Sequence, residues 1–301
     1  MLTRRQAALM ALLTLMWGVN WPMMKFSLRE VTPLWFRALT MTAGVATLAA
    51  FYLWRGTDLR ITRADAPRVA TLALPNIVGW HLFSILGLAA LASGRAAILG
   101  FTMPVWTVLL AVALGTERLR PRVLVSAACA LAAVLLLSAQ EWAGLAGRPL
   151  GVLWMQCAAL CWAAGTLMMR RTTLAMTTEA VTIWMMAFGA VAFWVVAPLA
   201  EPVPPFASFS AATWWSLAYG AFINFGFAQV IWFGMARDLP PTASAFAIMA
   251  VPLVGLAGAT VLVGEVPHLT DLAAALCIVA AIAAALIRRA PVAGTGRRTP
   301  G

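Results

Sequence analysis

The chain has 301 residues, of which 63% are apolar and 10% are charged. Soluble domains are about 45–50% apolar and about 25% charged, so this composition excludes an ordinary soluble enzyme. The net charge of +11 does not indicate nucleic-acid binding, because the arginines lie in short gaps between apolar runs and form no basic face interleaved with aromatic residues. We therefore expect an all-α integral membrane protein with the lipid bilayer as its main solvent.

Ten apolar runs follow one another along the chain, each about as long as the 20 residues that a helix needs to cross a bilayer. Short gaps that contain charged residues, glycine or proline separate these runs. The first run lacks the short core and the cleavage site of a secretory signal, so we expect it to remain as a span. The predicted transmembrane helices cover about 6–25, 33–54, 69–90, 93–115, 121–140, 150–170, 179–200, 211–236, 242–264 and 269–288.

The basic residues are distributed unevenly between the two sides of such a ten-helix protein. If both termini share one side, sixteen arginines fall on that side, and only Lys25, Arg29, Arg95 and Arg148 fall on the other. Cytoplasmic loops carry an excess of Lys and Arg. The pattern therefore predicts a multi-pass protein of the bacterial inner membrane with both termini in the cytoplasm.

The two halves of the chain repeat each other. Trp17 matches Trp162 at an offset of 145 residues, and further matches occur at an offset of 148: Asn76 with Asn224, Pro104 with Pro252 and Glu117 with Glu265. Each half then holds five helices, and because five is odd the halves must be inserted upside down relative to each other, as in many transporters. We expect a first five-helix repeat at 1–148, an inverted second repeat at 149–290, a central cavity between them and a disordered cytoplasmic tail at 291–301.

Polar and aromatic side chains inside the spans are the candidates for substrate binding, because a polar group among lipid tails costs free energy unless it finds a partner. Alternatives remain open for two of them. The face of Trp17 can instead be a tight helix contact at Gly18, and His81 is either a packing residue or a proton carrier. The predicted substrate-binding residues are Trp17, Asn20, Asn76, Trp80, His81, Met103, Trp162, Asn224, Gln229 and Trp232.

Three further groups of residues stand out. Pro104 and Pro252 each remove a backbone hydrogen bond near the middle of a span, which predicts a static kink or a position that bends. Glu117 and Glu265 end the same two helices, where the macrodipole disfavours a negative charge. We expect a structural role for them, with a neighbouring helix N-terminus or an arginine as the partner. Arg37 lies one turn inside the second span, from where it is expected to reach outward as a structural charge, with a direct substrate role as the alternative.

Catalytic and metal chemistry find little support in the sequence. The four cysteines lie inside apolar runs, and neither histidine has metal-ligand spacing to them. No span carries a serine-nucleophile motif, paired aspartates or a His-Glu metal motif. We expect no enzyme activity, no metal and no cofactor.

Several of these residues resemble a known family. They are the Trp-Gly-x-Asn-Trp of residues 17–21, the pair Phe36-Arg37, the Gly-Thr-Glu-Arg-Leu of residues 115–119 and the pair Gly264-Glu265. In this order, and within two five-helix halves, they resemble the drug/metabolite transporter (DMT) superfamily, EamA type, over residues 6–288. The resemblance is strongest to YddG-type exporters of aromatic and other amino acids. It implies a ten-helix basket around a central cavity, alternating access and efflux of small metabolites.

Two departures limit what the resemblance transfers. The second half has Trp162-Ala163-Ala164-Gly165 where the first has Trp-Gly-Val-Asn, and Thr182 stands at the position of Arg37. We expect an exporter of small amphipathic metabolites, chiefly neutral and aromatic amino acids. Efflux of drugs or quaternary cations is an alternative, and a membrane sensor that binds a ligand without transport is an alternative of another class. The sequence leaves the oligomeric state open, with a monomer as one option.

Overall fold

The computed structural model describes residues 3–143, 149–238 and 241–286, so the predicted tail at 291–301 lies outside the described residues. Within those ranges the chain is helical and contains no strand. In chain order the elements are α1 (Arg4–Ser27), α2 (Pro33–Trp54), α3 (Ala66–Ala73), η1 (Leu74–Gly79), α4 (Trp80–Ala90), α5 (Ser93–Gly100), α6 (Met103–Ala113), α7 (Pro121–Ala143), α8 (Pro149–Arg171), α9 (Thr178–Ala200), η2 (Phe206–Ser208), α10 (Ala211–Ala218), η3 (Tyr219–Phe227), α11 (Ala228–Asp238), α12 (Pro241–Gly258), η4 (Ala259–Val263) and α13 (Leu269–Leu286).

These helices follow the predicted spans closely. Eight helical stretches are long and apolar enough to cross a bilayer, and among the described residues two shorter apolar stretches, Ala250–Val263 and Leu269–Ala284, complete the set. Large apolar side chains such as Leu135 on α7 and Leu276 on α13 are exposed on the outside of the bundle. Such an exterior is stable only in lipid. The chain is therefore an all-α, multi-pass membrane protein.

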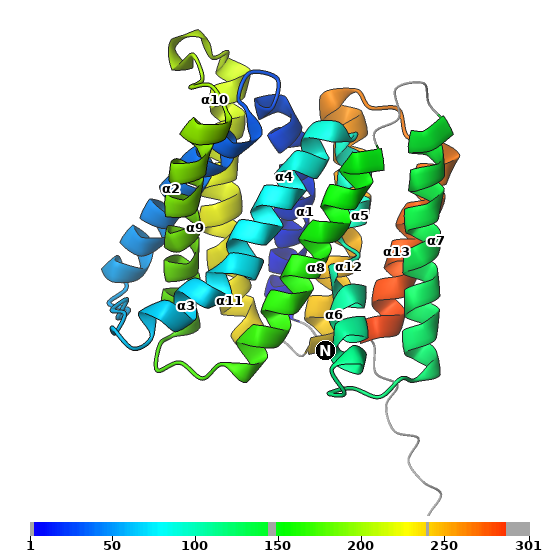
Figure 1. Cartoon of the computed structure of the whole chain (residues 1–301), viewed down its shortest axis with the longest axis horizontal. Helices are drawn as coiled ribbons and strands as arrows, with labels where there is room; N and C mark the ends of the chain where they lie inside the picture. The colour runs from blue at the N-terminus through cyan, green and yellow to red at the C-terminus, as the bar shows by residue number, and fades with distance from the viewer. Residues whose placement is uncertain (1–2, 144–148, 239–240, 287–301) are drawn as a thin grey trace, which may run out of the picture.

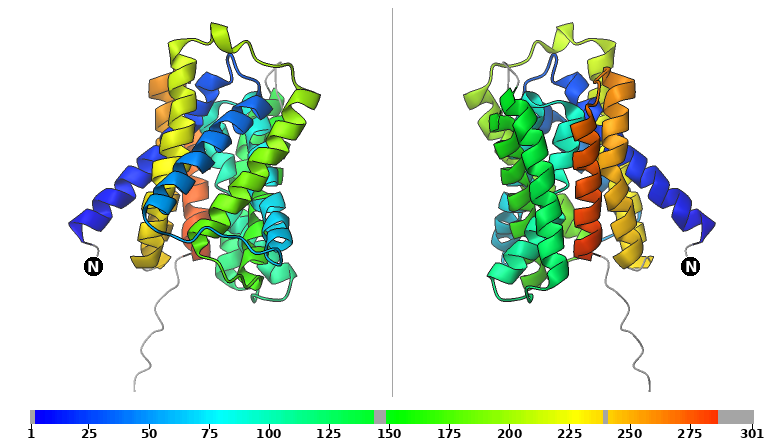
Figure 2. Two further views of the ribbon diagram at one scale, coloured as in Figure 1. Left: turned by 90° about the vertical axis from the view of Figure 1, so that its left-hand side faces the viewer. Right: turned by 90° about the vertical axis from the view of Figure 1, so that its right-hand side faces the viewer.

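The two halves run in opposite directions through the bundle (Figure 1). The helix α1 starts at the end that we call the proximal end, which carries Arg4, Trp54 and Arg171, and α8 starts at the other end, the distal end, which carries Ser27 and Ala90. Five crossings per half produce this inversion, because an odd number leaves each half on the opposite side from where it began. In the two side views of Figure 2 most helices run roughly along the vertical direction, and the N-terminal part of α1 leans away from the bundle.

Contacts between the halves follow the symmetry that the repeats predict. The helix α1 packs on α12, and the corresponding α8 packs on α5 and α6. The helix α2 packs on η3, and the corresponding α9 packs on α3 and η1. The pairs α2 with α9 and α7 with α13 join equivalent helices directly. Each half therefore completes the core of the other.

The span around Pro104 differs from the expected kinked helix. The chain leaves the helical path between α5 and α6, and Pro104 is the second residue of α6. The amide of Phe101 donates to Ala97 O at 3.3 Å and that of Thr102 donates to Leu99 O at 3.2 Å, which closes α5 in a tighter turn. Proline is favoured in the first turn of a helix, because its missing N–H has no partner to lose there. Its counterpart Pro252 remains inside the helix α12.

The spans that contain Asn76 and Asn224 have an unusual backbone. Each asparagine lies in a π-helical segment, η1 for Asn76 and η3 for Asn224. A π-helix adds one residue per hydrogen-bonded turn and so changes the direction of the following side chains. Both halves therefore carry the same distortion at matching positions.

At the distal end, three carboxylates cap helices of the opposite half. Glu201 accepts hydrogen bonds from the first backbone N–H groups of α2 at 3.0–3.3 Å. Glu265 accepts from the first N–H groups of α5 at 2.7 and 3.1 Å, and Glu30 accepts from the N–H that precedes α10 at 2.7 Å. A helix N-terminus attracts negative charge and has N–H groups without partners. These carboxylates fasten the halves together at this end.

Candidate functional site

One aromatic pair joins the first helix to the second half. The rings of Trp17 on α1 and Trp232 on α11 have centroids 5.4 Å apart and are tilted by 50°. Tilted aromatic pairs are favourable because the edge of one ring is positive and the face of the other is negative. Both side chains are only half-buried. Two predicted binding residues, one from each half, are thus in contact.

The helix α1 also contains a close helix contact and a buried oxygen atom without a hydrogen-bond partner among the described residues. Gly18 lies so near Val254 of α12 that an added Cβ would overlap the valine side chain. Asn20, two residues further, is buried, and its Oδ1 has no hydrogen-bond partner among the described residues. The tight-contact alternative therefore holds for Gly18, while the amide of Asn20 keeps a free acceptor.

A second group of rings lies where α4 meets the second half. Trp80 and Trp162 of α8 have centroids 5.3 Å apart in an edge arrangement. The imidazole of His81 packs edge-on against Phe225 of η3 at 5.2 Å. His81 is buried, and its Nδ1 has no hydrogen-bond partner in the described part of the chain. The predicted residues Trp80 and Trp162 are therefore in contact between α4 and α8, while the predicted residue His81 contacts η3 of the second half.

Asn76 lies in a helix contact. Its Nδ2 donates to Leu72 O at 2.9 Å on its own span, and its amide fills the space above Gly165 of α8. The matching Asn224, together with Gln229 and Met103, is half-buried. No hydrogen bond or ring contact within the described ranges joins these three to the aromatic pairs.

Gln156 of α8 was not among the predicted site residues. Its Oε1 accepts from Trp106 Nε1 at 2.9 Å and from Thr102 Oγ1 at 3.3 Å. It therefore bridges the break between α5 and α6, and its Nε2 is buried without a partner among the described residues. The sequence signal was an amide in an otherwise apolar span, but nothing in the sequence showed that the helix opposite it is broken.

Arg37 corrects an expectation. The sequence favoured a side chain that reaches outward to the interface, but Arg37 is only 3% exposed. Its Nε donates to His81 O and its Nη2 donates to Ser84 Oγ, both at 3.3 Å. The cause is packing: α2 faces α4 at this depth, so the side chain finds its acceptors inside the protein.

The two matching glutamates have different surroundings. Both backbone N–H groups bond six residues back, from Glu117 to Ala111 O and from Glu265 to Ala259 O, at 3.1 Å each. The carboxylate of Glu265 caps α5 and also accepts from Ser93 Oγ at 2.8 Å. Glu117 at the proximal end is exposed. The repeat thus has the same backbone at both positions, with a carboxylate partner described only for Glu265.

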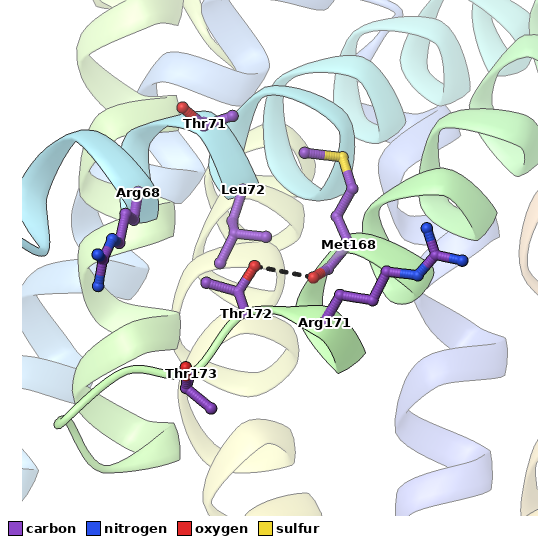
Figure 3. A pocket seen from close by; sticks show the side chains of 7 residues that line it. All are labelled: Arg68, Thr71, Leu72, Met168, Arg171, Thr172 and Thr173. Carbon is purple, nitrogen blue, oxygen red and sulfur yellow. Dashed lines mark hydrogen bonds between the residues drawn. The ribbon is translucent and has the colours of Figure 1, made fainter.

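A pocket of about 370 Å³ opens at the proximal end between α3 and the end of α8 (Figure 3). Its walls carry two arginines and three threonines, although the two guanidinium groups point away from each other. Two of the threonine hydroxyls, those of Thr71 and Thr172, donate to carbonyls four residues earlier in the chain, those of Pro67 and Met168. The lining residues are Arg68, Thr71, Leu72, Met168, Arg171, Thr172 and Thr173.

Taken together, these groups suit reversible binding better than covalent chemistry. Aromatic rings, neutral amides and one buried guanidinium surround the contact between the halves. Among the described residues, no group of three or more His, Cys, Asp or Glu could hold a metal ion. Rings and amides bind solutes that combine an apolar part with hydrogen-bonding groups.

Comparison with known proteins agrees with this architecture. Two transporters of Bacillus subtilis (strain 168) are similar: "Uncharacterized transporter YoaV", 24% identical over 81% of this chain and 83% of its own, and "Uncharacterized transporter YvbV", 27% identical over 92% and 90%. A solved crystal structure of a protein with 24% identity superposes with a TM-score of 0.66 and covers 94% of this chain and 97% of its own, which shows the fold. The model of the EamA-like transporter family matches twice, at residues 5–139 and 149–287. This chain therefore belongs to the EamA-like transporter family, within the drug/metabolite transporter superfamily.

Proposed function

We propose that the protein exports small amphipathic metabolites, chiefly neutral and aromatic amino acids, in the manner of YddG-type exporters. The observation that carries this proposal is the pair of tryptophan contacts across the halves, Trp17 with Trp232 and Trp80 with Trp162. An amino acid has an apolar side chain that suits such rings and two charged groups that need hydrogen-bonding partners.

The charge inside the bundle favours amino acids over cationic drugs. Aromatic faces attract cations, but the buried guanidinium of Arg37, which donates to the backbone carbonyl of His81, would repel them. The buried acids of the described chain, Asp65, Glu179 and Asp271, lie at the ends of helices. Efflux of quaternary cations is therefore the weaker candidate.

We propose alternating access as the mechanism, with 1–148 and 149–290 as the two moving repeats around a central cavity. Each half packs on the other through symmetric helix pairs, so exchange between two symmetric sets of contacts would open one end and close the other. The break at Pro104 and the π-helical segments η1 and η3 supply positions where the backbone can change direction.

The distribution of arginines supports an orientation. The proximal end carries the loops around Arg60, Arg120 and Arg171 (Figure 1). Because positively charged loops remain in the cytoplasm, we place this end in the cytoplasm, the distal end outside it, and the protein in the bacterial inner membrane. Exported amino acids would thus enter the protein from the cytoplasm at the end that holds the pocket and leave it at the distal end.

Reconstitution tests the proposal. Purified protein in liposomes should transport labelled Phe, Met or Thr, with and without an imposed proton gradient. The substitutions Trp17→Ala and Trp162→Ala should each lower flux about tenfold, which corresponds to about 1.4 kcal/mol of lost aromatic contact. Trp215→Ala is the matched control, since this tryptophan is 74% exposed on the outside of the bundle. No flux with a broad amino-acid panel would refute the proposal, and ligand-induced thermal stabilisation without flux would instead indicate a sensor.

A further inference from the structure

The guanidinium of Arg37 is a buried charge within the membrane-spanning part of the fold. Arg37 is the fifth residue of α2, and it is 3% exposed. An arginine that close to a helix end usually extends to the interface, where water solvates the charge. Here the side chain turns toward α4 instead. Intramembrane charges are costly, and they mark binding sites or ion pathways more often than structural contacts.

The partners of Arg37 do not neutralise it. The carbonyl of His81 and the hydroxyl of Ser84 are both neutral, and both hydrogen bonds are long at 3.3 Å. The ring of Phe36 lies 5.5 Å from the guanidinium carbon. Among the described residues no carboxylate forms an ion pair with Arg37. A buried charge without an opposite charge is strongly unfavourable, so this site is incomplete without an anion.

Lys25 provides a useful contrast. It is half-buried, and its ammonium donates to the carbonyls of Leu88, Ala89 and Leu91 at 2.7–3.2 Å. These carbonyls form the negative end of α4, which favours a cation. Its role is therefore to hold α1 against the end of α4. Within the described ranges, Arg37 has no comparable set of acceptors.

The neighbourhood of Arg37 fits an anion that carries an apolar group. His81, whose carbonyl binds Arg37, packs its ring on Phe225 from the second half, and its Nδ1 has no partner in the described part of the chain. The repeat counterpart of Arg37 is Thr182, whose hydroxyl bonds to its own helix at Thr178 O. The asymmetry leaves one guanidinium, which suits a ligand with a single anionic group.

We propose that Arg37 binds the carboxylate of the transported amino acid, with Ser84 as the residue that positions the guanidinium. This inference rests on the proposed function and assigns the residue that distinguishes an amino acid from an uncharged or cationic analogue. An arginine presents its N–H groups in a plane that matches the two oxygens of a carboxylate. The ligand would supply the negative charge that the described surroundings of Arg37 lack.

A comparison of ligands with and without a carboxylate tests this assignment. The dissociation constants of phenylalanine, 3-phenylpropionate and phenylalaninamide are measured on the purified protein by calorimetry or thermal shift. The wild type should bind the two carboxylates at least tenfold more tightly than the amide. Arg37→Gln should weaken both carboxylates at least tenfold and change the amide less than twofold, while Arg37→Lys should retain part of the preference. Arg29→Gln, at an exposed arginine of the same end, should leave all three constants unchanged.

The outcomes separate this inference from the proposed function. If Arg37→Gln keeps the wild-type preference for carboxylates, or loses all three ligands equally while its melting temperature is normal, the assignment is wrong and transport of amino acids stands. If the wild type neither binds nor transports any of the three ligands, the proposed function fails as well. Should Arg37→Gln not fold, Ser84→Ala serves instead. It should weaken phenylalanine several-fold and leave the amide unchanged, and equal effects on both would refute the positioning role.

Discussion

The amide of Asn76 occupies the space above Gly165, where any other residue would place its side chain, at the contact of η1 with α8. Without a Cβ, Gly165 lets the two backbones approach closely, as small residues do in membrane-protein interfaces. Asn76 in turn satisfies one of its N–H groups on Leu72 O. At this position the polar group and the glycine depend on each other.

We therefore expect Gly165→Ala to destabilise the protein. A methyl group at this position would overlap the amide carbon, oxygen and nitrogen of Asn76, and overpacking of this kind costs about 1–3 kcal/mol. The melting temperature in detergent should fall by several degrees. Gly234→Ala is the control, because no atom lies within 4 Å of the position of its added Cβ, and there the melting temperature should stay constant or rise.

A second substitution checks the cause. If the overlap with Asn76 accounts for the loss, Asn76→Ala in the Gly165→Ala background should recover most of the stability, since the shorter side chain leaves room for the methyl group. Losses from the two single variants that simply add would show that the residues act independently.

At the scale of helices, the distal end is organised by carboxylates that cap α2, α5 and α10 across the halves. For Glu30, the hydrogen bond from the backbone N–H of Ser210 lowers the pKa of the carboxyl below its ordinary value of 4.5, with smaller contributions from the hydroxyls of Ser210 and Thr213. Because this carboxyl is exposed to water, its hydrogen bonds stabilise the start of α10 only weakly and form no part of the core.

The pH dependence of stability follows from this lowered pKa. A carboxyl whose pKa is lower in the folded state stabilises the fold at pH values above its unfolded pKa, and this contribution disappears as the pH falls through the folded-state pKa. The melting temperature should therefore decline as the pH drops below about 4.5, and Glu30→Gln should reduce that decline. Glu117→Gln, at an exposed carboxylate of the proximal end, should keep the wild-type pH profile. An unchanged profile for Glu30→Gln would contradict the role of this cap.

The elements themselves could be predicted because a span in lipid needs a run of apolar residues that few other structures require. The break before Pro104 could not, since a proline in the middle of an apolar run is equally compatible with a kink or with the start of a new helix. The direction of Arg37 depended on which helix faced it, and only the packing of α4 decided that. Ring partners such as Trp17 with Trp232 required knowledge of how the halves fit together.

At the scale of the molecule, the charged contacts between the halves that the described residues make are concentrated at one end. The caps by Glu30, Glu201 and Glu265 lie at the distal end, as does the ion pair in which Arg95 Nε lies 2.9 Å from Asp271. At the proximal end, the described hydrogen bonds between the halves are neutral, such as that from Trp184 Nε1 to Leu59 O at 2.6 Å. The described ionic contacts between the halves thus lie at the distal end, and the described pocket opens at the other end.

If these contacts hold the distal end shut, weakening them should expose the contact between the halves from outside. Cys161 is a natural reporter, because it precedes Trp162 on α8 and is half-buried. In a chain with the other three cysteines replaced by alanine, the double variant Glu265→Gln, Asp271→Asn should react several-fold faster with a membrane-impermeant maleimide added outside. The two carboxylates make their contacts only while the distal end is closed. Removing their charges therefore shifts the equilibrium toward a conformation with an open distal end, by the free energy of the lost contacts. Glu117→Gln, the repeat counterpart at the proximal end, should leave external labelling at the wild-type rate. A double variant that transports normally yet labels no faster would show that apolar packing alone, and not these carboxylates, keeps the distal end closed.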